Sequence, residues 1–191
     1  MPNVANRIIK LINSGKTVFT TNELALFWKI TNSNVLRVTI NRYIKSNYLI
    51  NLQRGIYTLK ENINKFELAV KLKKYSYISF ETVLLAENII NQWDDKIISA
   101  SNRTLSTENK YGEFKYRQLP DSILFNKNGI IKKNNYSIAT PERALCDKVY
   151  KDGIIYFDNV ESLDKAKITK LIKIYNNKRF ERDIKKLIED L

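Results

Sequence analysis

The deciding stretch of the chain is residues 20–59, which read TTNELALFWKITNSNVLRVTINRYIKSNYLINLQRGIYTL. A short apolar segment, Glu23–Trp28, is followed by a polar break and then by a second amphipathic segment, Ser33–Lys45. Two β-like runs come next, Tyr48–Ile50 and Ile56–Leu59, joined through a basic turn. Helix, turn, helix and hairpin in this order are typical of a winged helix-turn-helix, which places its second helix in the DNA major groove.

A further helix is predicted before this stretch, at Val4–Ser14. Its apolar residues recur at mostly helical spacing, and Gly15 supplies a natural C-terminal stop. One of the residues 20–22 is expected to cap the following helix, since Thr and Asn are good capping residues. Glu23 then lies near the positive end of that helix, where a carboxylate is favourable.

The segment Ser33–Lys45 has two chemically different faces. The inward face carries Leu36, Ile40, Tyr43 and Ile44, which we expect to pack on the preceding helices. The predicted DNA-binding residues are Ser33, Asn34, Arg37, Asn41, Arg42 and Lys45 on the opposite face, and Arg54 at the hairpin tip. Arg can pair bidentately with guanine and Asn with adenine, whereas Lys more commonly meets phosphates. The alternative is a solvated helix face and a plain hairpin turn.

The charge of the chain supports a nucleic-acid partner. The net charge is +13, from 33 basic and 20 acidic residues. Residues 1–62 hold nine Lys and Arg against two Glu, whereas the rest of the chain has 24 against 18. A local excess of positive charge suits a phosphate backbone. The abundance of Lys, Asn and Ile could instead reflect a nucleotide bias of the source genome.

The composition also excludes several chemistries. The chain has no histidine, one cysteine and five glycines. Without histidine there is no Ser-His or Cys-His nucleophile system and no His-metal site. One cysteine cannot build a Cys-rich zinc site, and the few glycines form no Gly-rich phosphate loop. We therefore expect no catalytic residues, no metal and no cofactor.

The sequence also predicts where the protein resides. No apolar run reaches the roughly 18 residues that a membrane span needs. Residues 1–7, MPNVANR, show no apolar signal core. The lone cysteine suits a reducing compartment. We therefore expect a cytoplasmic protein without a membrane partner.

The polar segment Lys60–Lys65 predicts a domain boundary, giving a winged helix-turn-helix domain at residues 1–62 and a mixed α+β domain at residues 63–191. The second domain alternates helix-like and strand-like patterns. Helices are predicted at 66–74, at 81–88 with Ser79 as cap, from Thr140 with Pro141 in the first turn, and from Asp164 onward. Strands are predicted at 97–100, 112–119, 123–125 and 136–139.

Two sets of charged residues in the second domain are candidates for chemistry. Asp94 or Asp95, followed by Glu113 and Lys115, resembles the spacing of a Mg²⁺-dependent nuclease, although such triplets arise often in a charged chain. The other set lies in the helix that begins after Thr140. There Arg143 and Asp147 are four residues apart and are expected to form a surface pair.

In the same helix, Glu142 suits the positive end of the helix dipole. Cys146 is expected to be a small core residue rather than a reactive thiol. A role of Glu142, Arg143 and Asp147 in function is the alternative to this structural interpretation.

Three short motifs carry a resemblance to a known family. They are Arg54-Gly55-Ile56-Tyr57, then YISFETVL at Tyr77–Leu84, and ATPERALCD at Ala139–Asp147. In this order and spacing they resemble AbiEi proteins, the antitoxin and repressor component of type IV (AbiE) abortive-infection toxin–antitoxin systems. The first motif resembles the family's N-terminal winged helix, and the other two resemble its second domain.

The resemblance implies a function in phage defence. Members of this family bind inverted repeats in their own promoter, repress transcription and counteract a nucleotidyltransferase-like toxin, generally without a stable complex. A single winged helix reads a short site, so two copies are expected on an inverted repeat, as a dimer or by cooperative binding. Two alternatives remain from the residues alone: a transcription regulator whose α+β domain senses a ligand, and a DNA-targeted nuclease.

Overall fold

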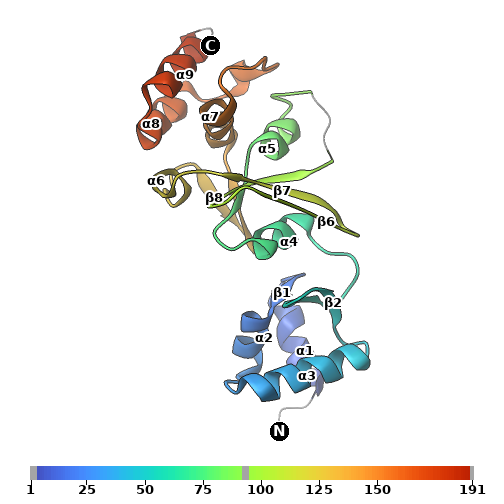
Figure 1. Cartoon of the computed structure of the whole chain (residues 1–191). Coiled ribbons are helices and arrows are strands. Elements are labelled where there is room, and N and C mark those ends of the chain that lie inside the picture. Colours follow the sequence, from blue (N-terminus) through green and yellow to red (C-terminus); the bar gives the residue numbers. More distant parts are fainter. Residues whose placement is uncertain (1–3, 92–94, 190–191) are drawn as a thin grey trace. The chain divides into compact units, whose positions relative to one another are not determined.

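The computed structural model describes residues 4–91 and 95–189 of the chain. The protein divides into two compact units, Met1–Leu72 and Lys73–Leu191 (Figure 1). The division therefore falls after Leu72, whereas the polar segment near residue 62 had indicated an earlier boundary. The helix at Lys65–Leu72 belongs to the first unit because its Glu67 and Lys71 side chains bond to residues of that unit.

The first unit contains helices and a small antiparallel sheet (Figure 1). Its elements are α1 (Val4–Asn13), β1 (Phe19–Thr20), α2 (Thr21–Trp28), α3 (Ser33–Lys45), β2 (Ile50–Gln53), β3 (Ile56–Thr58) and α4 (Lys65–Leu72). The strand order is β1-β3-β2, so β3 pairs with both neighbours.

The first strand of the hairpin lies later than the expected Tyr48–Ile50. The backbone N–H groups of Tyr48 and Leu49 both donate to the carbonyl of Tyr43, at 2.9 and 3.2 Å, and so complete the end of α3. Leu49 is buried in the core at this point. Pairing in the sheet therefore begins only at Ile50.

The core of the first unit confirms the inward face predicted for α3. Leu36, Ile40 and Tyr43 are buried, and Ile44 packs against them while partly exposed. These side chains meet α1, α2 and the chain around them in one cluster, whose other buried members are Leu11, Phe19, Leu24, Trp28 and Leu49. The amphipathic spacing of α3 therefore fixes which of its faces is left for solvent.

The second unit is mixed α+β, as the sequence predicted. Its elements are β4 (Tyr77–Ile78), α5 (Glu81–Ala86), β5 (Ile97–Ser101), β6 (Leu105–Asn109), β7 (Gly112–Gln118), α6 (Asp121–Leu124), β8 (Ile130–Lys133), β9 (Tyr136–Ala139), α7 (Pro141–Asp152), the 3-10 turn Val160–Ser162, α8 (Lys165–Tyr175) and α9 (Lys178–Glu189). The sheet order is β6-β7-β5-β4-β9-β8, with β5 parallel to β7 and β4 parallel to β9. Helix α7 contacts α5, α8 and α9 and so is central to the helical layer.

Two local predictions for the second unit were wrong. The run 123–125 was expected to be a strand, but Asp121–Leu124 is the short helix α6. The carbonyl of Pro120 accepts from the N–H groups of Ile123 and Leu124, at 3.0 and 2.8 Å, which closes a helical turn. Ser79 was expected to cap α5, yet Phe80 occupies that position and the Ser79 hydroxyl donates to Asp147.

Arg143 and Asp147 do not form the expected surface pair, because both side chains are completely buried. The guanidinium of Arg143 donates to Asp147 at 3.1 Å, to the Tyr77 hydroxyl at 3.0 Å and to the Ile123 carbonyl at 2.7 Å. A further bond goes to the Asn128 carbonyl at 2.8 Å. Sequence spacing placed the two residues on one helix face but could not show that this face points inward.

The carboxylate of Asp147 is equally well satisfied. It accepts from the hydroxyls of Tyr77, Ser79 and Tyr175, at 2.9, 2.7 and 2.6 Å. Burial and the adjacent Asp147 charge raise the pKa of Tyr77 and of Tyr175 well above the usual value, so both phenols stay protonated donors. The network therefore links β4, α7 and α8 through hydrogen bonds in the core of the second unit.

Removing one partner of this buried pair should destabilise the second unit strongly. Arg143→Met leaves the Asp147 carboxylate buried without its cation, and we expect the free energy of unfolding to fall by about 3–5 kcal/mol. Urea unfolding followed by circular dichroism measures the change. The control is Lys185→Met. It breaks the ion pair of Lys185 with Glu181, which has the same helical spacing but lies on the exposed surface. That variant should unfold like the wild type, and equal losses in the two variants would contradict the assignment.

Candidate nucleic-acid interface

A short turn connects α2 and α3 and is defined by backbone contacts. Lys29 ends α2 in the left-handed conformation, with φ of 54°, and the N–H of Ile30 donates to the Ala25 carbonyl at 3.0 Å. Asn32 then starts α3, because its side-chain oxygen accepts from the N–H groups of Asn34 and Val35 at 3.0 and 3.1 Å. Such side-chain capping fixes the first residue of a helix, and here it sets where α3 begins.

The exposed face of α3 carries the residues of this helix that were predicted to bind DNA. Ser33, Asn34, Arg37, Asn41, Arg42 and Lys45 are all exposed. Side chains three and four positions apart lie on one helix face, so Asn34, Val38, Asn41 and Lys45 form the centre of this face. The amphipathic pattern of the sequence predicts both the polar residues of this face and an exposed Val38 among them, and the Val38 side chain is 65% exposed in the structure.

The charge of α3 is entirely positive. The helix sequence SNVLRVTINRYIK holds three basic residues and no acidic one. The guanidinium carbon of Arg42 lies 5.6 Å from the centre of the Tyr43 ring, within the range of a cation–π contact. Tyr43 is fixed in the core, so this contact places the guanidinium of Arg42 beside a buried ring although Arg42 as a whole is exposed.

Arg54 lies apart from the α3 face, at the tip of the β2–β3 hairpin. Gly55 follows it with φ of +80°, and its carbonyl accepts from the Thr21 N–H at 3.0 Å. A Cβ at Gly55 would lie 3.4 Å from the Thr21 hydroxyl. The tip is thus anchored to the first residue of α2, and Arg54 itself is exposed.

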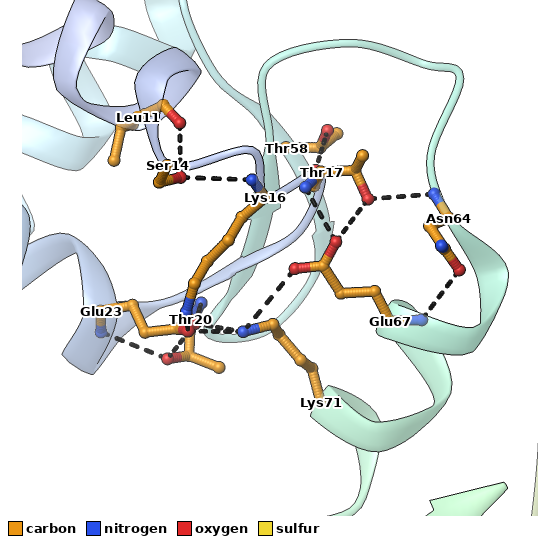
Figure 2. Close-up of polar contacts among 10 residues, drawn as sticks. All are labelled: Leu11, Ser14, Lys16, Thr17, Thr20, Glu23, Thr58, Asn64, Glu67 and Lys71. Carbon is orange, nitrogen blue, oxygen red and sulfur yellow. Dashed lines mark hydrogen bonds and ion pairs between the residues drawn. The ribbon is translucent and has the colours of Figure 1, made fainter. Parts of the chain in front are cut away.

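Helix α2 is held at its start by a single carboxylate, that of Glu23 (Figure 2). The Thr20 hydroxyl accepts from the Glu23 N–H at 3.3 Å, while the Glu23 carboxylate accepts from the Thr20 N–H at 2.9 Å, which completes a capping box. The same carboxylate is paired with the Nζ atoms of Lys16 and Lys71, each at 2.5 Å. Thr20 is therefore the cap among residues 20–22, and Glu23 connects α2 to α4.

A second contact of α4 is buried beside it. One Glu67 oxygen accepts from both the N–H and the hydroxyl of Thr17, each at 2.8 Å (Figure 2). The Thr17 carbonyl in turn accepts from the Thr58 hydroxyl at 2.7 Å. These bonds tie α4 to the loop before β1 and to the last residue of β3. Local patterns in the sequence do not indicate these bonds, because Thr17 and Glu67 are 50 residues apart.

The charged triplet considered for a nuclease shows a different arrangement. Asp94 lies outside the described residues, and Asp95 is exposed. Glu113 is paired with Lys96 at 3.5 Å and accepts from the Ser106 hydroxyl at 3.2 Å. Lys115 is exposed on the same face of β7. Within residues 4–91 and 95–189, no three His, Cys, Asp or Glu side chains gather in a way that could hold a metal ion.

The helix motif ATPERALCD and the motif YISFETVL meet in the buried network described above. Tyr77 and Ser79 belong to YISFETVL, and Arg143 and Asp147 belong to ATPERALCD. Glu142 is buried next to them and pairs with Lys167 at 3.3 Å. Cys146 is buried as expected, and burial raises the pKa of its thiol far above the usual value. These motif residues therefore serve the core of the second unit.

Neither the protein-family models nor the curated proteins include a match to this chain. Of the helices in the described parts of the chain, none combines the length and the apolar character needed to cross a membrane.

The pairing of Glu23 predicts a pH dependence of the first unit. Partial burial raises the pKa of Glu23, but hydrogen bonds from Lys16, Lys71 and the Thr20 backbone outweigh it and lower the pKa from 4.5 to about 2. A carboxyl whose pKa is lowered on folding stabilises the folded state above its unfolded pKa. We therefore expect the stability of the first unit to fall as the pH drops from about 4.5 towards 2.

Glu23→Gln tests this dependence because glutamine can keep the capping box without the charge. The variant should be less stable than the wild type above pH 4.5, and its stability should change less between pH 4.5 and 2. Urea unfolding followed by Trp28 fluorescence, in a Trp93→Phe background, measures both. Glu181→Gln, on the second unit, should leave this profile unchanged. Parallel pH profiles for wild type and Glu23→Gln would refute the prediction.

Proposed function

We propose that the protein is a DNA-binding transcription repressor whose first unit is a winged helix-turn-helix. The observation that carries the proposal is the exposed face of α3. That face holds asparagine and arginine side chains, is positively charged, and stands opposite the face that α3 buries in the core. Helix α3 follows α2 after a tight turn, which is the order of a helix-turn-helix. A hairpin with an exposed arginine follows α3.

In this proposal α3 enters the major groove and the residues divide into two roles. Arg37, Asn41 and Arg42 have the side chains that pair with base edges, guanine for arginine and adenine for asparagine. Lys45 and Arg54 contact phosphates, and so position the helix without reading sequence. Ser33 and Asn34 lie in the first turn of α3, where a recognition helix approaches the bases.

One such helix covers a short site, so the proposed operator is an inverted repeat bound by two copies. Half-sites about one turn of DNA apart would present the same groove face to each copy. We propose that the repeat lies in the promoter of the protein's own operon, so that binding represses it. This part of the proposal rests on the resemblance to AbiEi proteins.

The second unit is proposed to be the antitoxin part of a type IV toxin–antitoxin system in the cytoplasm. The support is the pair of motifs at Tyr77–Leu84 and Ala139–Asp147, which resemble the AbiEi second domain and which pack together in this fold. In that family a nucleotidyltransferase-like toxin is counteracted without a stable complex. We propose the same relation here.

Operator binding tests the first part of the proposal. Arg37→Ala and Arg42→Ala should each weaken binding to the DNA just upstream of the gene by about 1–3 kcal/mol, if each pairs with guanine. A gel-shift titration with a scrambled duplex and varied salt measures the affinity and its specificity. Arg182→Ala removes another exposed arginine, from α9, and should bind like the wild type. Wild-type affinity in both α3 variants would reject α3 as the reading helix.

Growth rescue tests the antitoxin part. Expression of the protein should restore growth of cells that produce the nucleotidyltransferase-like toxin encoded beside it, and the two proteins should not co-purify. Arg37→Ala should still rescue growth, because α3 serves DNA and not the toxin. Failure of the wild type to restore growth would reject the antitoxin function and leave DNA binding untouched.

A further inference from the structure

Val38 occupies a position on α3 that the fold does not explain. Its side chain is 65% exposed although it is apolar. It is also β-branched, which makes it a weaker helix former than the many polar residues that could stand there. Neither the core of the first unit nor the stability of α3 therefore accounts for valine at this position.

The neighbours of Val38 define its surroundings. Asn34 lies four residues before it, Asn41 three residues after it, and Lys45 one turn further, so all share the centre of the exposed face. Arg37 and Arg42 lie on the two flanks of this central strip. An apolar side chain is thus bracketed by two carboxamides on a face that is otherwise basic and polar.

The major groove offers a matching surface. Thymine presents an apolar C5-methyl group there, and adenine presents an acceptor and a donor that fit a carboxamide. A helix rises about 1.5 Å per residue, so Asn34 and Asn41 are separated by about 10 Å along α3. Base pairs are spaced by about 3.4 Å, so this strip spans about three base pairs.

We propose that the centre of the α3 face selects A·T base pairs, with Val38 packed against the methyl group of a thymine and Asn34 and Asn41 directed to adenines. The inference rests on the proposed DNA-binding function and specifies the bases that it selects. Positive charge at Arg37, Arg42 and Lys45 favours DNA as the occupant of this face over another protein surface. Arg37 and Arg42 on the flanks then contact bases at the ends of the half-site.

The test is a double-mutant cycle between the Val38 side chain and the thymine methyl. The full-length protein is titrated by gel shift on its upstream DNA, in which the half-site thymines are replaced one at a time by deoxyuridine. Uracil lacks only the methyl group. Loss of one buried methyl should weaken wild-type binding about fourfold at one position.

In Val38→Ala the thymine and uracil duplexes should bind with nearly equal affinity. Alanine is the better helix former, so α3 stays intact in this variant. Val35→Ala is the matched control, because Val35 is 53% exposed on the same helix but lies at the margin of the face. It should keep the fourfold preference for thymine.

The outcomes separate the two proposals. Specific binding that is equal on every thymine and uracil duplex would overturn the inference and leave DNA binding in place. A thymine preference that persists in Val38→Ala, or that disappears only in Val35→Ala, would also overturn it. Equal affinity for upstream and scrambled DNA would overturn the proposed function and the inference together.

Discussion

The first unit depends on one carboxylate, that of Glu23. It completes the cap of α2, and it also holds the ammonium groups of Lys16 and Lys71. These partners come from the loop after α1 and from α4, so three separate segments converge on a single side chain. Partly buried carboxylates are tolerable only when paired and hydrogen-bonded, and Glu23 meets both conditions. The start of α2, and through the turn the position of α3, follows from this arrangement.

The second unit also contains a carboxylate that is paired with a cation and hydrogen-bonded, but there both charged groups are fully buried. Arg143 and Asp147 are both inaccessible, and their hydrogen-bonding groups are taken up by tyrosine, serine and backbone partners. A buried pair of this kind adds little stability beyond what apolar residues would give, but it requires one arrangement of its partners. The motifs at Tyr77–Leu84 and Ala139–Asp147 meet in the core through these bonds.

Local patterns in the sequence predicted the parts of the fold that depend on local physics. The bounds of Ser33–Lys45 and its inward face follow from helical spacing, and the structure has both. The run at 123–125 failed because three apolar residues fit a buried strand or a helical turn equally well. The depth of Arg143 and the bond between Thr17 and Glu67 depend on contacts between distant residues, which periodicity does not report.

The candidate site was more predictable than its support, because exposed polar residues on an amphipathic helix are visible as a pattern. The amphipathic pattern does not distinguish residues that attract any DNA duplex from residues that select particular base pairs. Arginine and lysine side chains attract any duplex through its phosphates, and that attraction weakens with salt. Asparagine and valine carry no charge, so their presence at the centre of the α3 face adds little to general affinity. Their groups gain energy only against matching base edges. In the proposed complex, Asn34, Val38 and Asn41 therefore contribute selectivity without charge, whereas Arg37 and Arg42 on the flanks combine attraction to phosphates with base reading.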